Sequence, residues 1–271
     1  MDNLYLFLLG TIQGLAEFLP ISSKSHLLLL QYFLGWPGES PLLLDVTLHF
    51  GTLCATIVYF RETVLRLIRE FLGFFTAFSA TMKSADGKLI QKIILSSIPT
   101  AVIGFTLKPV FEANSGSLFF LDCGFLITGL LLIISERMSL RGRVREEVSF
   151  LDALLVGCVQ GVSVLPGISR SGSTIAYLLV RRYSLETAFK YSFLISMPAV
   201  MGAVILEGHH ALKAGSFRLS YLFGAAVACI SGLFALRFLK FSLKKRKFRW
   251  YGYYLLVLCA AIAGYLCLAR K

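Results

Sequence analysis

Six apolar stretches of the chain each approach the ~20 residues that an α-helix needs to cross the hydrocarbon of a membrane. The sequence has a mean hydropathy of +0.75, and only 15% of its 271 residues are charged. A water-soluble protein of this length needs more polar surface, so the sequence predicts an all-α, polytopic integral membrane protein. The predicted membrane-spanning helices, about six in number, cover residues 42–60, 89–107, 118–135, 186–206, 219–239 and 250–268.

The distribution of basic residues predicts the orientation of these spans. Of the 27 Lys and Arg residues, 20 lie in 61–92, 136–148, 181–190 and 237–249, whereas 36–41, 108–117 and 207–218 hold none, one and two. The positive-inside rule places the first group in the cytoplasm and the second outside. Basic loops beside a membrane account for the net charge of +12, so we expect no nucleic-acid partner. Residues 64–75 form an amphipathic run that predicts an interfacial helix.

Two segments, 1–35 and 150–182, do not fit as ordinary spans. Each has an apolar piece, a proline with a polar cluster, and a second short apolar piece. Residues 10–26 (GTIQGLAEFLPISSKSH) and 157–173 (GCVQGVSVLPGISRSGS) share G-x-x-Q-G, then L-P, then Ser-basic-Ser. The second copy enters from the face opposite to the first. The sequence therefore predicts an inverted-topology repeat with two re-entrant, broken helical hairpins.

We interpret residues 1–271 as one membrane domain made of two repeats. Repeat one covers about 1–135 and repeat two about 150–271. A simpler alternative is that the first hairpin is one kinked transmembrane helix followed by a loop. If the hairpins are real, a pseudo-two-fold axis brings both polar clusters together near the middle of the membrane.

The second polar cluster has the residue types of an anion-binding site. Ser169, Arg170, Ser171, Gly172 and Ser173 precede or open an apolar segment. Backbone N–H groups at a helix start, hydroxyls and a guanidinium together form a cradle for an anion, and the planar fork of Arg suits phosphate. A cation at the bilayer centre costs roughly 2.5–3.5 kcal/mol, so Arg170 is expected to be functional. The alternative is a polar turn from which Arg170 snorkels to the interface.

The first polar cluster offers candidate metal ligands. Glu17 follows Gln13 by four residues, which puts both side chains on one helical face. Their oxygens could hold a divalent cation such as Mg²⁺ or Ca²⁺, with a phosphate supplying further oxygen ligands. Alternatively, Glu17 forms an ion pair with Lys24 or Arg170.

The same cluster offers candidate catalytic and substrate-binding groups. His26 could act as a general acid or base, or attack phosphorus itself, and Ser23 could be the nucleophile with His26 as its base. The sequence does not choose between these. Ser22 and Lys24 are candidate substrate-binding residues.

A carboxylate, a histidine, serines and two cations favour phosphoryl transfer or hydrolysis of a phosphorylated lipid. The sequence has no Walker A motif, which argues against a protein driven by nucleoside-triphosphate hydrolysis. The competing hypothesis is a translocase or transporter that carries a polyprenyl phosphate or phospholipid headgroup in the same cradle, because inverted repeats with broken hairpins are typical of transporters.

The motifs QGLAEFLPISSKSH and PGISRSGST, with LLDVTLHFGTLCATIVYFR (43–61) after the first hairpin, carry a specific resemblance. In motif order, hydropathy and length, essentially the whole chain resembles the bacterial undecaprenyl-diphosphate phosphatases, the bacitracin-resistance family. The resemblance implies hydrolysis of undecaprenyl diphosphate to undecaprenyl phosphate and inorganic phosphate, which recycles the lipid carrier for peptidoglycan synthesis.

The resemblance also implies a divalent cation and a multi-pass location in the bacterial cytoplasmic membrane, with the active site open to the outer face. By position, Gln13 and Glu17 correspond to the family's acidic motif. Ser23 and His26 correspond to the nucleophile or acid–base residues, and Ser169 and Arg170 to residues that hold the diphosphate. The acidic motif has its Gln-first form here, so Glu17 is its one carboxylate. A homodimer is compatible with the sequence, which does not fix the oligomeric state.

Overall fold

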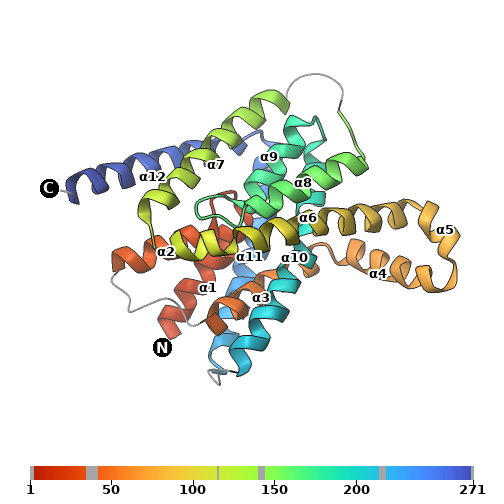
Figure 1. Ribbon diagram of the computed structural model, residues 1–271, viewed down its shortest axis with the longest axis horizontal. Helices are drawn as coiled ribbons and strands as arrows, with labels where there is room; N and C mark the ends of the chain where they lie inside the picture. Colours follow the sequence, from red (N-terminus) through yellow and green to blue (C-terminus); the bar gives the residue numbers. More distant parts are fainter. Residues whose placement is uncertain (1–2, 35–41, 115, 140–143, 214–217, 270–271) are drawn as a thin grey trace.

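The computed structural model describes residues 3–34, 42–114, 116–139, 144–213 and 218–269. Its regular elements, within these ranges, are α-helices, which confirms the predicted all-α class. The predicted outer segment 36–41 lies outside the described residues. The helices, arranged as in Figure 1, are α1 (Asn3–Phe18), α2 (Ser23–Leu34), α3 (Leu42–Tyr59), α4 (Arg61–Thr76), α5 (Phe78–Lys83), α6 (Ala85–Asn114), α7 (Leu118–Ser139), α8 (Phe150–Val162), α9 (Arg170–Val180), α10 (Leu185–Lys213), α11 (Tyr221–Lys244) and α12 (Phe248–Ala269).

The predicted number of spans is confirmed. Within the described ranges, five helices (α6, α7, α10, α11 and α12) are long and apolar enough to cross a membrane, and α3 with α4 makes a sixth candidate. The chain bends by 87° between α3 and α4. Helix α4 contains the predicted amphipathic run 64–75, and with α5 and the start of α6 it extends to the right of the other helices in Figure 1.

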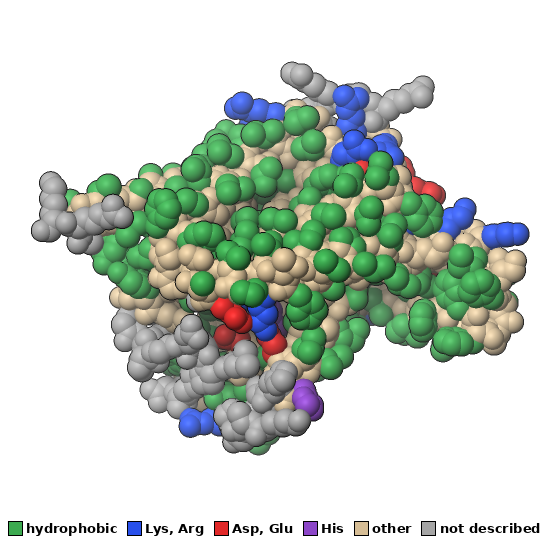
Figure 2. All heavy atoms as spheres, viewed as in Figure 1, with side chains coloured by type: hydrophobic (Ala, Val, Ile, Leu, Met, Phe, Trp, Pro, Cys, Tyr) green, Lys and Arg blue, Asp and Glu red, His purple; other side chains and the backbone are tan. Residues whose placement is uncertain are grey.

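Apolar side chains cover most of the face shown in Figure 2, while several Lys and Arg gather toward its top and right edges. Large exposed hydrophobic residues occur on every predicted span, among them Phe105 on α6, Phe234 on α11 and Val257 on α12. An apolar surface of this extent needs lipid rather than water around it. The protein is therefore a multi-pass membrane protein.

Both predicted hairpins are broken helices. Helix α1 has 16 residues and α2 has 12, so each is shorter than the ~20 residues of a full span. The break contains Pro20, and Ser22 has a φ of 69°. In the second hairpin the break contains Pro166, and Gly167 has a φ of 79°. Since α1 contacts α2 and α8 contacts α9, the structure favours hairpins over one kinked helix in the first segment.

The glycines of the shared G-x-x-Q-G pattern allow close contact between helices. A Cβ atom at Gly14 would lie 2.4 Å from the carbonyl oxygen of Ala228 on α11. A Cβ atom at Gly157 would lie 2.2 Å from the carbonyl oxygen of Ser96 on α6. Small residues let helix backbones approach in this way inside membranes. Each hairpin thus packs its first helix on a helix of the other predicted repeat; the inverted orientation of the two repeats stays a prediction.

A buried carboxylate holds together the two ends of the second hairpin that lie away from its tip. The side chain of Asp152, near the start of α8, is 0% exposed and lies 2.8 Å from Arg145 Nη1 and 2.6 Å from Arg181 Nε. Hydroxyl groups of Ser149, Tyr177 and Tyr183 also donate to it. Because Arg181 caps the end of α9, this network fixes both helices of the hairpin that carries Arg170.

Candidate active site

The tips of the two hairpins meet inside the protein, as the sequence predicts. Gly167 N donates to Ser25 Oγ across 2.6 Å, and Ser171 Oγ lies 3.4 Å from the carbonyl oxygen of Leu19. A Cβ atom on Gly172 would lie 3.1 Å from Pro20 Cβ. These contacts join the turn after α1 to the start of α9, so the polar clusters form one site.

Glu17 is the centre of this site. Its side chain, at the end of α1, is only 8% exposed. Arg170 Nη2 donates to Oε1 across 2.5 Å, Ser23 Oγ donates to Oε2 across 2.7 Å, and Gln13 Nε2 donates to Oε2 across 3.2 Å. The carboxylate is therefore oriented by one residue from the second hairpin and two from the first, and it accepts the hydrogen bond of the Ser23 hydroxyl.

Arg170 has an unused donor group. Its side chain is 17% exposed, which contradicts the alternative of snorkelling to the interface. Nη2 contacts Glu17, whereas the buried Nη1 has no hydrogen-bond partner among the described residues. A buried donor without a partner costs about 1–3 kcal/mol, so an acceptor supplied by a ligand would stabilise this arrangement.

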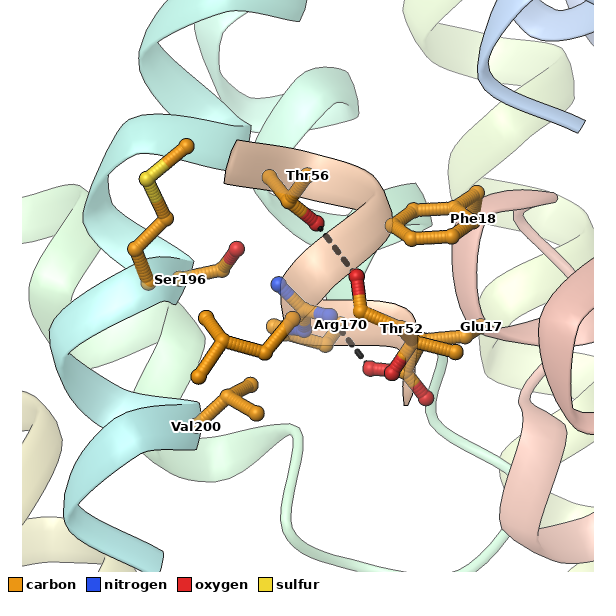
Figure 3. Close-up of a pocket in the computed structure, with 9 residues that line it drawn as sticks. Glu17, Phe18, Thr52, Thr56, Arg170, Ser196 and Val200 are labelled. Carbon is orange, nitrogen blue, oxygen red and sulfur yellow. Dashed lines mark hydrogen bonds and ion pairs between the residues drawn. The ribbon is translucent and has the colours of Figure 1, made fainter. Parts of the chain in front are cut away.

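A small pocket of about 10 Å³, which is room for about one water molecule, lies beside the ion pair. Figure 3 shows Arg170 with Ser196 and Val200 of α10 on one side and Glu17 on the other, and with Thr52 and Thr56 of α3 beside it. Phe18, Leu53 and Met197 complete its walls. The pocket combines one guanidinium, one carboxylate and three hydroxyl groups with an apolar wall. These group types match a phosphate on an apolar chain, but α3 and α10 must move apart to admit one.

The other residues of the predicted anion cradle are buried, and most of their polar groups bond to one another or to the nearby backbone. Ser169 is the N-cap of α9, and its side chain accepts from Gly172 N across 3.1 Å. Ser169, Ser171 and Ser173 are at most 4% exposed, and in the part of the chain that the structure describes Ser173 Oγ has no hydrogen-bond partner. These contacts support a role in starting α9 at Arg170. Direct binding of substrate by these residues and Gly172 stays a prediction.

His49 of α3 belongs to the site and is absent from the sequence-based candidates. Gln13 Nε2 lies 3.1 Å from His49 Nδ1, and Glu17 Oε2 lies 3.8 Å from the same nitrogen. The amide nitrogen of Gln13 carries two hydrogens, so it can contact Glu17 and His49 at the same time. Its position inside an apolar span, in LLDVTLHFG, was the available signal, since an ionisable residue there is functional by default.

His26 faces away from Ser23. Its Nε2 lies 2.8 Å from Tyr254 Oη, and its Nδ1 lies 3.0 Å from the carbonyl oxygen of Ser22. The Ser22 side chain contacts Ser25 Oγ across 3.0 Å. Both ring nitrogens of His26 therefore contact groups other than Ser23, although Ser23 is only three positions away in the sequence.

Lys24 extends toward a different helix. Its Nζ lies 3.7 Å from the centre of the Phe111 ring on α6. A cation over an aromatic face is attracted by the ring's quadrupole. Of the two cations predicted to pair with Glu17, the structure selects Arg170. Substrate binding by Lys24 and Ser22 stays a prediction.

The predicted metal site does not fit the described residues by themselves. Among them, no group of three or more His, Cys, Asp and Glu side chains could hold a metal ion. Both Glu17 oxygens accept hydrogen bonds, and Gln13 presents its amide nitrogen to Glu17 rather than its oxygen. A cation here would depend on oxygens supplied by a bound diphosphate.

The fold and this site define a polytopic membrane protein with a buried Arg–Glu–Ser arrangement at the meeting point of two broken hairpins. The chain belongs to the bacitracin resistance protein BacA family, whose model matches residues 6–261.

Curated relatives cover nearly the whole chain. It is 38% identical over 267 residues to an undecaprenyl-diphosphatase of Carboxydothermus hydrogenoformans, with 97% of both chains covered. An undecaprenyl-diphosphatase of Desulforapulum autotrophicum is 40% identical over 268 residues, covering 95% of this chain and 96% of the relative. One of Rubrobacter xylanophilus is 35% identical over 276 residues, covering 99% and 100%.

Proposed function

We propose that this protein hydrolyses undecaprenyl diphosphate to undecaprenyl phosphate and inorganic phosphate, and so recycles the lipid carrier for peptidoglycan synthesis. The observation that carries the proposal is the contact of Ser23 and Arg170 with opposite oxygens of Glu17. A nucleophile, its proton acceptor and a phosphate-binding cation are thereby assembled in one buried place. The names of the curated relatives support the substrate.

In the proposed reaction Ser23 Oγ attacks the terminal phosphorus of the diphosphate. The new bond joins Ser23 Oγ to phosphorus, the bridging P–O bond breaks, and undecaprenyl phosphate leaves with the electron pair. Glu17 takes the proton of Ser23, to which it is already hydrogen-bonded across 2.7 Å. Water then cleaves the phosphoserine, which releases inorganic phosphate and restores the hydroxyl. The geometry favours Glu17 over His26 as the base, because both His26 nitrogens are occupied elsewhere.

Arg170 stabilises the charge of the transferred phosphoryl group. Its free Nη1 is the donor in place for a phosphate oxygen, while Nη2 remains on Glu17. Such preorganised donors cost no reorganisation at the moment of reaction. We propose that the terminal phosphate binds at Nη1, since Arg170 also lines the pocket between α3 and α10.

The divalent cation remains a proposal. When bound, it would neutralise charge on the diphosphate, with Glu17 and Gln13 as its predicted protein ligands. The roles given above to Ser23, Glu17 and Arg170 do not depend on it. A chelator titration of phosphate release, followed by re-addition of Mg²⁺ or Ca²⁺, tests it.

We place the protein in the bacterial cytoplasmic membrane with its site open to the outer face. The basic segments support this orientation, since 20 of the 27 Lys and Arg lie in segments assigned to the cytoplasm. Cysteine accessibility on intact cells tests it. The suggested homodimer also remains a proposal, to be tested by the mass of the protein in detergent.

Phosphate release from undecaprenyl diphosphate by purified protein in detergent tests the function. Release that is lost in Glu17→Gln and Arg170→Ala variants of normal folding supports hydrolysis. Well-folded protein that releases no phosphate, but moves a labelled polyprenyl phosphate across liposomes, would establish the translocase alternative instead.

A further inference from the structure

Two hydrogen bonds connect the last helix of the chain to the turn before Ser23. Tyr254 Oη on α12 lies 2.8 Å from His26 Nε2, and His26 Nδ1 lies 3.0 Å from the carbonyl oxygen of Ser22. Ser22 immediately precedes Ser23. The hydrolytic roles assigned above leave both Tyr254 and His26 unexplained.

The carbonyl partner fixes the direction of the first hydrogen bond, and in a neutral ring this also sets the direction of the second. A carbonyl oxygen can only accept, so His26 Nδ1 carries the hydrogen that it donates to Ser22. In the neutral ring Nε2 then has only a lone pair, which accepts from the hydroxyl of Tyr254. Ring contacts restrain the imidazole further: it stacks on Tyr254 at 5.8 Å and meets the edge of Phe125 at 5.4 Å.

The Ser22 backbone is a place where such restraint matters. Its φ of 69° lies in the left-handed region, which costs a non-glycine residue roughly 1–2 kcal/mol. Its carbonyl oxygen accepts from both the backbone nitrogen and Nδ1 of His26. Since this conformation sets the direction in which the next residue leaves the turn, it determines whether Ser23 Oγ reaches Glu17 Oε2.

We propose that Tyr254 is a positioning residue which, through His26, holds the Ser22 turn and aims Ser23 at Glu17. The inference rests on the proposed hydrolysis. It assigns His26 a positioning role in place of the predicted proton transfer. Tyr254 comes from α12, so the final helix of the second predicted repeat completes the first hairpin.

Nitrogen-15 spectra of histidine-labelled protein in detergent test the hydrogen-bond chain without turnover. The chain contains four histidines, and the signal lost in His26→Asn identifies His26. We expect that signal to show the tautomer with hydrogen on Nδ1, and to shift in Tyr254→Phe. A matched control exists, because Tyr265 of α12 also reaches α2, where its Oη lies 3.3 Å from Tyr32 Oη. Tyr265→Phe should leave the His26 signal unchanged.

Turnover supplies the second readout. Losing one neutral hydrogen bond that orients Ser23 should lower kcat about 3- to 10-fold in Tyr254→Phe with KM unchanged, whereas Tyr265→Phe should match the unaltered protein. The Asn side-chain nitrogen can take the place of Nδ1, while Gln reaches only the position of Nε2. His26→Asn should therefore keep at least about tenfold more activity than His26→Gln, with the pH profile of the unaltered protein.

The opposite tautomer, an unchanged His26 signal in Tyr254→Phe, or a His26→Gln variant more active than His26→Asn would overturn the positioning role. Loss of one limb of the pH profile in His26→Asn would do the same, because it would show proton transfer by the ring. Absence of phosphate release by the unaltered protein would contradict the proposed function alone, since the histidine spectra do not depend on catalysis.

Discussion

Arg170 Nη2 lies 2.5 Å from Glu17 Oε1, although the two residues are 153 positions apart in the chain. Both side chains are largely buried, with 17% and 8% of their surfaces exposed. Each therefore depends on the other, because an unpaired charge in a low-dielectric site is costly. The contact joins the two hairpins electrostatically as well as sterically.

The first prediction separates the contribution of this ion pair to stability from its contribution to phosphate release. Glu17→Met or Arg170→Met alone leaves one buried charge unpaired and should destabilise the protein by about 3 kcal/mol, whereas the double variant should be more stable than either single variant. All three should lack phosphate release. Thermal unfolding in detergent measures the stability, and a double variant that shows the sum of both losses would contradict the account.

The second prediction concerns Ser23 as nucleophile. Ser23→Ala should reduce phosphate release by about 10³-fold or more, because the attacking oxygen is gone, with little change in stability. Ser97 on α6 offers a matched control, since its hydroxyl donates to the backbone of its own helix at Ile93. Ser97→Ala should keep full activity. Equal activity of Ser23→Ala and the unaltered protein would remove Ser23 from the mechanism.

The third prediction concerns the repeated glycines. Gly14→Leu should destabilise the α1–α11 contact strongly, because even a Cβ atom there would lie 2.0 Å from Ser231 Oγ. Gly104→Leu is the control, since no described residue lies within 4 Å of a Cβ atom at that position on α6. The yield of folded protein and the melting temperature are measured for both variants, and both should fall in Gly14→Leu only. Similar melting temperatures would show that the close contact is dispensable.

The fourth prediction concerns the Asp152 network, which joins the start of α8 to the end of α9. Asp152→Asn should lower stability by about 2–3 kcal/mol, less than the ~3–5 kcal/mol of fully buried pairs, because Arg145 and Arg181 are 41% and 44% exposed. The control is Asp86→Asn, which removes a more exposed pair with Arg66 at 3.5 Å and should cost about 0–1 kcal/mol. Equal melting temperatures would contradict the assigned role.

Much of the architecture could be predicted from the sequence, because apolar length and helix-breaking residues act locally. The spans, the breaks around Pro20 and Pro166 and the meeting of the two tips all follow from such signals. The similarity of residues 10–26 and 157–173 supplied the long-range information, since it implied equivalent places for both clusters.

Side-chain partners were harder to predict, because they depend on rotation about helix axes and on residues from distant helices. His49 enters the site from α3 and Tyr254 contacts His26 from α12, and neither contact has a counterpart in the spacing of the hairpin motifs. Lys24 and Ser23 are adjacent in sequence, yet one contacts Phe111 and the other Glu17, since successive helical residues point in different directions.

The most direct test of the central claim is a quenched-reaction analysis of the Glu17–Ser23–Arg170 site. Purified protein is mixed with undecaprenyl diphosphate labelled in its terminal phosphate, stopped within one turnover and digested for mass spectrometry. The account predicts labelled phosphate on Ser23 before its release, and none in Glu17→Gln or Arg170→Ala. Phosphate release without label on Ser23, or with label on His26, would contradict it.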